Sequence, residues 1–410
     1  MNMPGENKKL LFLTLITIKS LDERGIYTDL LRKFHEEGYD ITIISPIERR
    51  YKENNSLKVI DRVRYINVKT LNIQKTNIFE KGLATILIEY QFLKMLKKYT
   101  KDIKFDIILY STPPITIVKP IKYIKERDDA LSYLLLKDIF PQNAVDMGLL
   151  KKNSLLYKFF RRKEKYLYNI SNYIGCMSNA NYKYLITHNK YLNKNFIEVN
   201  PNSISPKVFL NKYSHRKNLN HKYSIPAKAL IFLYGGNLGL PQGLDFFMKV
   251  LEINMHDENM FFLIIGSGTE SNLVKKFIEK KEIKNALYLS NFSKNEYDLI
   301  IESCDIGLIF LSNKFTIPNF PSRMLSYLEN KMPIIAATDS TTDIGDIIEY
   351  NNAGISLISG DIVAMQSALN KYVNDRELVI SHGENAQQLL MKNYLVNTTY
   401  NLINNKLINV

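Results

Sequence analysis

The sequence is poor in the residues that build disulfide frameworks and metal centres. Its 410 residues include two cysteines, Cys176 and Cys304, which is too few for a disulfide framework. Both lie in apolar runs, which predicts buried thiols in a reducing compartment. The six histidines form no cluster with the spacing of metal ligands.

Long apolar runs are missing as well. The first one, residues 10–18, is far shorter than the ~20 residues that a membrane-spanning helix needs, and no later run reaches that length. We predict a buried strand there, and neither a signal peptide nor a membrane span. The protein is expected to be cytoplasmic, or peripheral on the inner face of the cell membrane.

Positive charge is in excess, with a formal net charge of +14 at pH 7. Such an excess suits nucleic acid, an anionic membrane surface or phosphorylated substrates. The sequence has no nucleic-acid-binding motif, so nucleic acid is not expected as a partner. A composition rich in Lys and Asn, inherited from the genome, is the alternative explanation that needs no anionic partner.

Short apolar runs alternate with longer amphipathic stretches through most of the chain. Runs of Val, Ile, Leu and Phe separated by helices are typical of parallel sheets covered on both faces. We therefore predict an α/β protein with two doubly wound, Rossmann-like domains. The predicted strands are residues 10–18, 40–45, 105–110, 131–136, 173–177 and 195–199 in the first domain and 229–234, 260–266, 286–290, 305–310, 333–337 and 353–358 in the second.

A polar stretch with three prolines, residues 200–228, separates the two series of strands. We place the linker near 200–206, which gives domains 1–203 and 204–383. The closing stretch, 384–407, is predicted to be a helix that could pack back onto the first domain. Ligands bind beyond the carboxyl ends of parallel strands, so the active site is expected in a cleft between the two domains.

Glycine-containing loops follow two predicted strands of the second domain. Gly235, Gly236 and Asn237 end the first of these strands, and Gly266 and Gly268 end the next. Glycines there let backbone amides approach a phosphate, and the following helix adds its positive dipole end. A tight turn between strand and helix is the alternative that requires glycine without any ligand.

The segment 321–334 contains a third candidate. Pro321 suits the first turn of a helix, and Arg323 lies at its start. An arginine there opposes the helix dipole, and a bound phosphate would relieve that repulsion. Ser326, one turn later, lies on the same side and could reach a ribose. An exposed surface arginine is the alternative.

These motifs together resemble glycosyltransferase family 4, which has the GT-B fold. In the second domain the matching segments are residues 235–243, 264–268, 304–311 and 321–334. In the first domain, residues 19–46 resemble the family's opening strand, loop and helix, and residues 161–178 its closing helix and strand. Elements of the bacterial capsule and O-antigen subgroup are similar to residues 110–118 and 134–148. The resemblance covers nearly the whole chain.

The resemblance implies retaining transfer of a sugar from a nucleotide-sugar, without a metal or other cofactor. Gly236 and Asn237 would lie at the diphosphate, where Arg323 would meet a phosphate. Gln242 would take the place of a lysine. The nucleotide-sugar site would be completed by Gly235, Gly266, Gly268, Ser326 and the backbone near Phe292, with Gly268 and Phe292 bordering the base.

The chain departs from the family pattern at two places. Many relatives carry a pair of glutamates where this chain has Pro318 and Ser326. The subgroup often lacks that pair too, so we do not interpret the change as loss of activity. A basic pair on the phosphate loop is replaced by Asn237 and Gln242, so Arg323 must compensate more of the phosphate charge.

Catalysis of this reaction mostly requires neutralisation of charge on the departing diphosphate, which makes Arg323 the first catalytic candidate. Asp138, after a predicted strand, is the candidate for orienting the acceptor or stabilising positive charge on the sugar. Glu23, in the first loop, is the other. For Asp138 a cap before Phe140, and for Glu23 a helix cap, are the structural alternatives.

The predicted helix 155–168 combines apolar side chains with the basic residues Arg161, Arg162, Lys163 and Lys165. Such a helix could rest on an anionic leaflet, and a core helix with a solvated basic face is the alternative.

The resulting hypothesis is a retaining glycosyltransferase in capsule or O-antigen synthesis. It would move a sugar from a nucleotide-sugar, expected to be a UDP-sugar, to a lipid-linked saccharide. The first domain would bind the acceptor and the second the donor. The alternatives are an inactive nucleotide-sugar-binding scaffold subunit and a nucleotide-sugar 2-epimerase of the same fold, for which the first-domain loops are poor in histidine.

Overall fold

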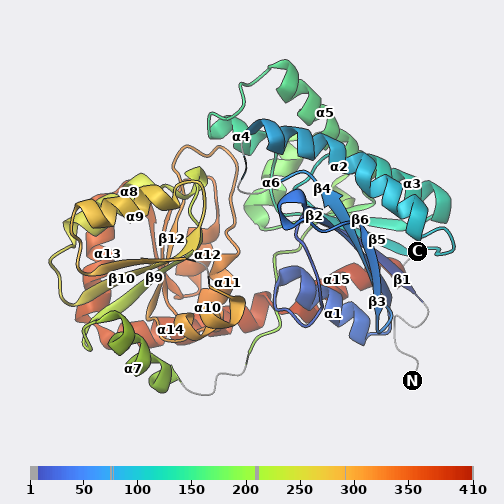
Figure 1. Cartoon of the computed structure of the whole chain (residues 1–410). Helices are drawn as coiled ribbons and strands as arrows, with labels where there is room; N and C mark the ends of the chain where they lie inside the picture. The colour runs from blue at the N-terminus through green and yellow to red at the C-terminus, as the bar shows by residue number, and fades with distance from the viewer. Residues whose placement is uncertain (1–7, 74–75, 77, 208–211, 291, 409–410) are drawn as a thin grey trace. The chain divides into compact units, whose positions relative to one another are not determined.

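The computed structural model describes residues 8–408 except 74–75, 77, 208–211 and 291. The chain divides into two compact units (Figure 1). Unit 1 comprises Met1–Ile204 and Val396–Val410, and unit 2 comprises Ser205–Leu395.

Unit 1 is built on an eight-stranded sheet of order β3-β4-β2-β1-β5-β6-β7-β8. Its strands pair in parallel except β3, which pairs antiparallel with β4. The strands are β1 Lys9–Leu13, β2 Asp40–Glu48, β3 Ser56–Ile60, β4 Val63–Thr70, β5 Ile107–Ser111, β6 Leu131–Leu136, β7 Tyr173–Cys176 and β8 Ile197–Val199.

Helices cover both faces of this sheet, as continuous apolar strands require. One face packs against α2 Ile78–Tyr99, α3 Val118–Asp128, α5 Leu155–Ile170 and α6 Asn179–His188. The other packs against α1 Ile26–Glu36 and α15 Val396–Ile408, which come from opposite ends of the chain. These two helices contact each other through the rings of Phe34 and Tyr400, whose centroids are 4.8 Å apart. The short helix α4 Gln142–Asp146 precedes α5.

Unit 2 has a six-stranded parallel sheet of order β11-β10-β9-β12-β13-β14. The strands are β9 Leu230–Asn237, β10 Met260–Ser267, β11 Ala286–Leu289, β12 Ile306–Phe310, β13 Ile334–Thr338 and β14 Gly354–Ile358. One face packs against α8 Leu244–Ile253, α9 Ser271–Lys280 and α13 Ile362–Asn374. The opposite face carries α10 Lys294–Ile301, α11 Arg323–Glu329, α12 Ile344–Tyr350 and α14 Arg376–Asn393 (Figure 1). Helix α7 Lys212–Tyr223 precedes β9.

The predicted α/β class with two doubly wound sheets is confirmed, and a strand forms at every predicted position. The first strand is shorter than predicted and ends at Leu13, because the Thr14 side chain accepts the Ile16 amide in a turn. The β3–β4 hairpin was not predicted. Its edge strand leaves Leu57, Val59 and Ile60 exposed, so it lacks the buried-strand pattern.

The prediction of one closing helix over 384–407 is wrong. Two helices occur there, since α14 ends at Asn393 and α15 begins at Val396. The break follows from packing within each unit. Tyr394 is buried in unit 2 near Phe320, while the Val396 amide donates to the Ile204 carbonyl in unit 1 at 3.0 Å. Both cysteines are free and buried, as predicted.

Candidate active site

The candidate site lies at the carboxyl edge of the unit 2 sheet, where β9 and β12 are neighbours. The chain leaves these two strands towards opposite edges of the sheet, which makes this the topological switch point. Strands β9 and β12 pair at Phe232 with Ile306 and at Leu233 with Gly307, whereas β9 continues beside β10 as far as Asn237. Open α/β sheets bind ligands in the crevice at such a point.

Tyr327 of α11 occupies the point where β9 and β12 separate. Its hydroxyl accepts the Gly235 amide at 2.9 Å and lies 3.2 Å from the carbonyl oxygens of Leu233 and Leu308, to which it can donate. The ring is fully buried against Gly307, where an added Cβ would lie 2.4 Å from ring carbons. The strands β9 and β12 separate here, so their backbone groups can no longer pair with each other. The Tyr327 hydroxyl provides hydrogen-bond partners for these groups instead.

Replacing Tyr327 with Phe is expected to lower the free energy of unfolding by about 1–3 kcal/mol, because the buried Gly235 amide loses its acceptor. Affinity for UDP should also fall, since Gly235 directly precedes Gly236 and Asn237, which are predicted to lie at the diphosphate. Denaturant titration and calorimetry measure both. Tyr372→Phe is the matched control, because that buried hydroxyl bonds His382 at 2.9 Å on the α13–α14 side. Unchanged stability in the Tyr327 variant would contradict this role.

Arg323 lies beside this switch point and is not an exposed surface arginine. Its guanidinium carbon is 4.5 Å from the ring centroid of Tyr234, and its Nη2 donates to Gln242 Oε1. Nη1 is buried and has no hydrogen-bond partner among the described residues. A Cβ on Gly236 would be 3.8 Å from the guanidinium, so this group lies next to the exposed end of β9.

The guanidinium keeps its charge at any physiological pH. Burial acts to lower the pKa of Arg323, but the hydroxyls of Tyr234 and Tyr327 act in the other direction, and the net shift is upward. A charged, buried group with one unpaired donor is suited to an anion, because burial strengthens the electrostatic attraction between them.

The glycines of the site serve two different purposes. Gly236 has φ +114° and is exposed, so its backbone faces solvent in a conformation that favours glycine. At Gly266 and Gly268 an added Cβ would lie 1.8 Å from the Gly236 carbonyl oxygen and 2.1 Å from the Leu238 carbonyl oxygen. Those two glycines are required by the close approach of β10 to β9. At Gly235 the Cβ would meet the Tyr297 hydroxyl at 2.2 Å.

The other predicted donor-site residues lie along the same edge. Gln242 is buried, and its carbonyl oxygen accepts from Arg323, so it orients the arginine. Asn237 is exposed, and its backbone carbonyl accepts from the Tyr234 hydroxyl at 2.8 Å. Phe292 is partly buried in the loop after β11, and Ser326 is partly buried one turn after Arg323.

Helix α11 begins at Arg323 after the cap residue Ser322, so Pro321 lies before the first turn and the predicted helix start is two residues too early. Pro318, one of the two positions where relatives have glutamate, is buried in the loop before α11. Sequence reasoning missed Tyr234 and Tyr327, since both lie in apolar runs that also predict ordinary core positions.

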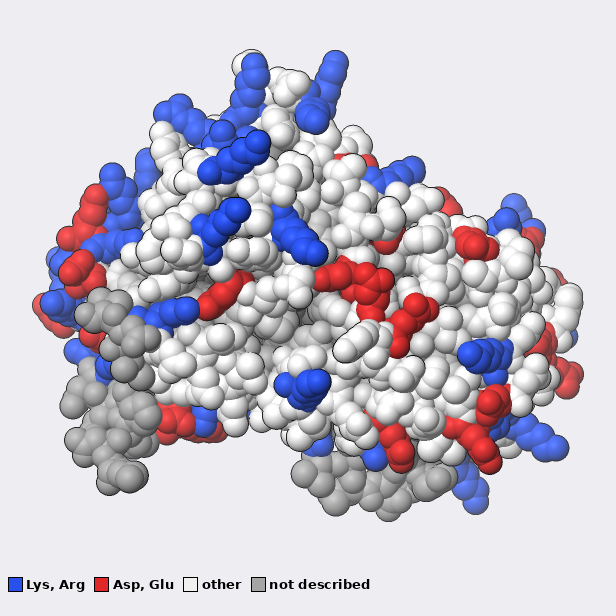
Figure 2. Space-filling view, turned by 180° about the vertical axis from the view of Figure 1, so that it is seen from behind, with Lys and Arg blue, Asp and Glu red and all other residues white. Residues whose placement is uncertain are grey.

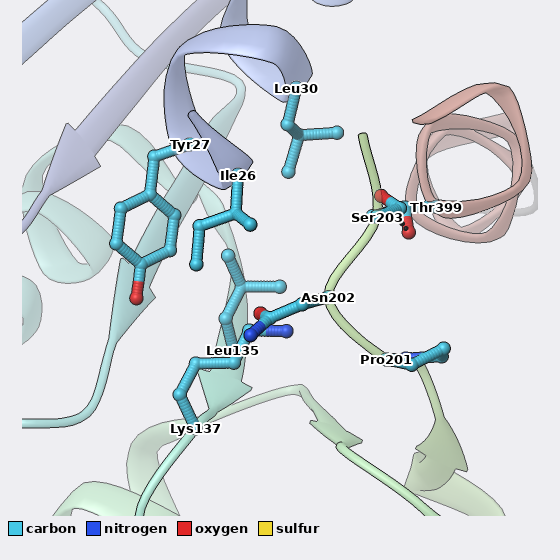
Figure 3. A pocket seen from close by; sticks show the side chains of 9 residues that line it. All are labelled: Ile26, Tyr27, Leu30, Leu135, Lys137, Pro201, Asn202, Ser203 and Thr399. Carbon is cyan, nitrogen blue, oxygen red and sulfur yellow. Dashed lines mark hydrogen bonds between the residues drawn. The ribbon is translucent and has the colours of Figure 1, made fainter. Parts of the chain in front are cut away.

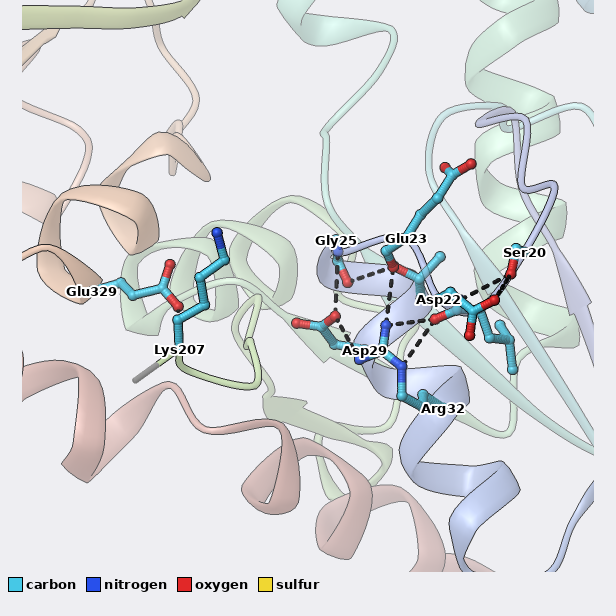
Figure 4. Close-up of polar contacts among 10 residues, drawn as sticks. Ser20, Asp22, Glu23, Gly25, Asp29, Arg32, Lys207 and Glu329 are labelled. Carbon is cyan, nitrogen blue, oxygen red and sulfur yellow. Dashed lines mark hydrogen bonds and ion pairs between the residues drawn. The ribbon is translucent and has the colours of Figure 1, made fainter. Parts of the chain in front are cut away.

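The two candidates in unit 1 are placed differently. Both carboxylate oxygens of Asp138 accept from the Asn143 side chain at 2.8 Å, so this aspartate braces the loop after β6. Glu23 is exposed; its backbone carbonyl accepts from Arg32 at 3.0 Å and its carboxylate points away from that network (Figure 4). Glu23 does not cap α1, whose N-cap is Gly25 without a side-chain bond.

Two Rossmann-like units, with a phosphate-compatible edge in the second, define the GT-B fold class. Solved structures share this fold. Anabaena Alr3699/HepE in complex with UDP and glucose is similar with a TM-score of 0.72 at 12% identity, covering 98% of this chain and 100% of that chain.

The sequence comparisons point to the same class. Residues 215–389 match the family model described as Glycosyl transferases group 1. The probable glycosyltransferase WbjE of Pseudomonas aeruginosa is 23% identical over 336 residues, 78% of each chain. The putative colanic acid biosynthesis glycosyl transferase WcaI of Escherichia coli K12 is 21% identical over 131 residues, 32% of each chain. The chain is therefore an enzyme, a glycosyltransferase, and its match to the group 1 model lies within unit 2.

Proposed function

We propose that this glycosyltransferase is a retaining enzyme of family 4. It transfers a sugar from a UDP-sugar to a lipid-linked saccharide during capsule or O-antigen synthesis, without a metal ion. Unit 2 binds the donor, and unit 1 binds the acceptor. The observation that carries the donor assignment is the buried guanidinium of Arg323, with its unpaired Nη1 at the β9–β12 switch point.

Arg323 acts on the leaving group in this proposal. As the bond from the sugar to the diphosphate breaks, negative charge develops on the phosphate oxygens. Arg323 Nη1 donates to one of these oxygens, and the exposed backbone at Gly236 and Asn237 lies beside it. Gln242 and the Tyr234 ring hold the guanidinium in place, so little reorganisation is needed during the reaction.

The finer assignments rest on similarity. HepE, which shares the fold, forms a complex with UDP and glucose, and WcaI is named for colanic acid biosynthesis. Retention follows from the resemblance to family 4.

Incubation of the full chain with UDP-, GDP- and dTDP-sugars and a lipid-linked oligosaccharide extract tests the proposal. Release of UDP that depends on the extract is the expected result, and NMR of the product should show the donor's anomeric configuration. EDTA should leave the rate unchanged. Turnover only with another nucleotide-sugar would refute the UDP-sugar donor, an inverted product would refute retention, and a loss of rate with EDTA would refute metal independence. Absence of any turnover would refute the whole proposal.

A surface of unit 1 suits contact with an anionic membrane. Within the described residues no helix is long and apolar enough to cross a bilayer. Around the start of α5, however, large apolar side chains are exposed, namely Leu149 (53%), Leu155 (86%), Leu156 (51%) and Phe159 (37%). Exposed basic side chains lie among them, namely Lys151, Lys152, Lys158, Arg162 and Lys165. We call this set the α5 surface.

Lys and Arg side chains also gather at the upper end of the face in Figure 2, with few acidic ones among them. One side of this helix belongs to the core of unit 1, as the core-helix alternative requires. Phe160, Leu167 and Tyr168 are buried in the core. Arg161 and Lys163 are engaged in ion pairs with Glu164 and Glu89 and do not contribute to the α5 surface.

The protein is expected to bind phosphatidylglycerol vesicles and to dissociate as salt rises, since the attraction is partly electrostatic. Leu155→Glu should weaken binding at least about tenfold, because a buried leucine contributes roughly 1.5–3 kcal/mol. Vesicle co-sedimentation measures this. Leu273→Glu, at a leucine of unit 2 that is 48% exposed, is the matched control. Equal binding by both variants would exclude the α5 surface as the contact.

A further inference from the structure

Unit 1 contains a small hollow of about 10 Å³ that is partly open to solvent and has room for roughly one water-sized group (Figure 3). It lies between the first turn of α1, the end of β6, residues 201–203 and Thr399 of α15. Since β6 and β8 end here, the hollow is at the carboxyl edge of the unit 1 sheet, the edge at which open α/β sheets bind ligands. Pockets for whole ligands usually measure about 300–1,000 Å³, so this hollow admits a single hydroxyl or water and not a whole sugar.

Lys137 supplies a hydrogen-bond donor to the hollow. It follows β6, and its side chain points into the hollow together with that of Leu135 (Figure 3). Its Nζ donates to the Asn200 carbonyl at 3.3 Å, which leaves further N–H groups for a ligand. Burial lowers the pKa of Lys137 to about 7. A lysine amine in this buried position therefore lowers the stability of the folded protein.

Asn202 supplies a hydrogen-bond acceptor to the hollow. The residue is 7% exposed, and its Oδ1 has no hydrogen-bond partner in the part of the chain that the structure describes. Two neighbouring polar side chains make hydrogen bonds of their own, although Asn200 Oδ1 also has no partner among the described residues. Ser203 donates to Thr399 Oγ1 at 2.8 Å, and the Asn200 side chain donates to the Tyr133 hydroxyl at 2.9 Å. The hollow thus offers Lys137 Nζ as a donor and Asn202 Oδ1 as an acceptor.

We propose that this hollow binds a hydroxyl group of the saccharide acceptor, which accepts from Lys137 Nζ and donates to Asn202 Oδ1. A hydroxyl has both functions, whereas a carboxylate or a fully ionised phosphate ester has no proton to donate to Oδ1. The acceptor role rests on the proposed function, while the binding chemistry of the hollow is independent of it.

Ligand-detected NMR tests the binding directly in the full chain, without turnover. The probes are the methyl glycosides of glucose, galactose, mannose and N-acetylglucosamine, with inorganic phosphate as the anion. At least one glycoside should show saturation transfer with the unaltered protein, and the signal should fall about tenfold or more in Lys137→Met and Asn202→Leu. Lys190→Met, at an exposed lysine of unit 1, should leave it unchanged.

A second measurement separates a ligand-binding lysine from a structural one. The folded-state pKa of Lys137 lies below its unfolded value, so the amine costs stability below about pH 10 and most fully below pH 7. Lys137→Met should therefore raise the thermal midpoint at pH 7 even as it loses glycoside binding. A lysine that merely supported the fold would give a lower midpoint.

Two results would overturn the inference: no glycoside bound by the unaltered protein, or binding that persists in both hollow variants. Binding of phosphate alone, lost in Lys137→Met, would also overturn it and assign an anion site. Failure of the proposed function would instead appear as absence of sugar transfer while glycosides still bind the hollow.

Discussion

Replacement of Arg323 by Ala is expected to lower kcat/KM for the nucleotide-sugar by about 10²–10³-fold, the usual effect of removing one donor that stabilises developing negative charge. The expected loss is large because no second basic side chain takes its place on the phosphate loop, which has Asn237 and Gln242 there. UDP affinity should fall as well, since the diphosphate keeps its charge after transfer.

Steady-state kinetics and calorimetry with UDP measure this effect. Arg376→Ala is the matched control, because Arg376 is exposed and donates to the Lys228 carbonyl just before β9, at the opposite edge of the sheet. Arg323→Lys should restore little, since a lysine cannot donate to Gln242 and to a phosphate in the same planar arrangement. Unchanged UDP affinity in Arg323→Ala would show that the donor site does not lie at this edge of the sheet.

Substitution of Gly266 by Ala is expected to lower the free energy of unfolding by about 3 kcal/mol, at the upper end of the range for overpacking. The added methyl group would lie 1.8 Å from the Gly236 carbonyl oxygen, which belongs to the backbone and cannot rotate away. Relief requires that β9 and β10 separate at their ends. That movement displaces Gly236, so UDP affinity should fall together with stability.

Gly82→Ala in α2 provides the control in denaturant titrations. An added Cβ there meets nothing within 4 Å, and alanine suits a helix better than glycine, so stability should rise by about 0.5–1 kcal/mol. Native stability in Gly266→Ala with lost UDP affinity would show that Gly266 serves the ligand and not the packing of the two strands.

The fold class followed from the sequence because parallel strands covered on both faces must be continuously apolar. That pattern located every strand except the hairpin β3–β4, whose outer strand is exposed. The glycines and Arg323 were recognisable from their positions, since glycines after a buried strand let the backbone approach a phosphate and an arginine at a helix start opposes the helix dipole. Their order along the chain was enough to suggest a nucleotide-sugar enzyme.

Which side chains meet at the site was decided by the tertiary structure. Gln242 and Arg323 are 81 residues apart, and their hydrogen bond exists because β9 and β12 are neighbours in the sheet. Tyr327 has the same apolar surroundings in sequence as any core residue, and its role depends on where two strands separate. The sequence alone likewise does not distinguish Lys137 from Asp138. One lines a hollow and the other is held by Asn143, because the direction of each side chain is set by the packing after β6.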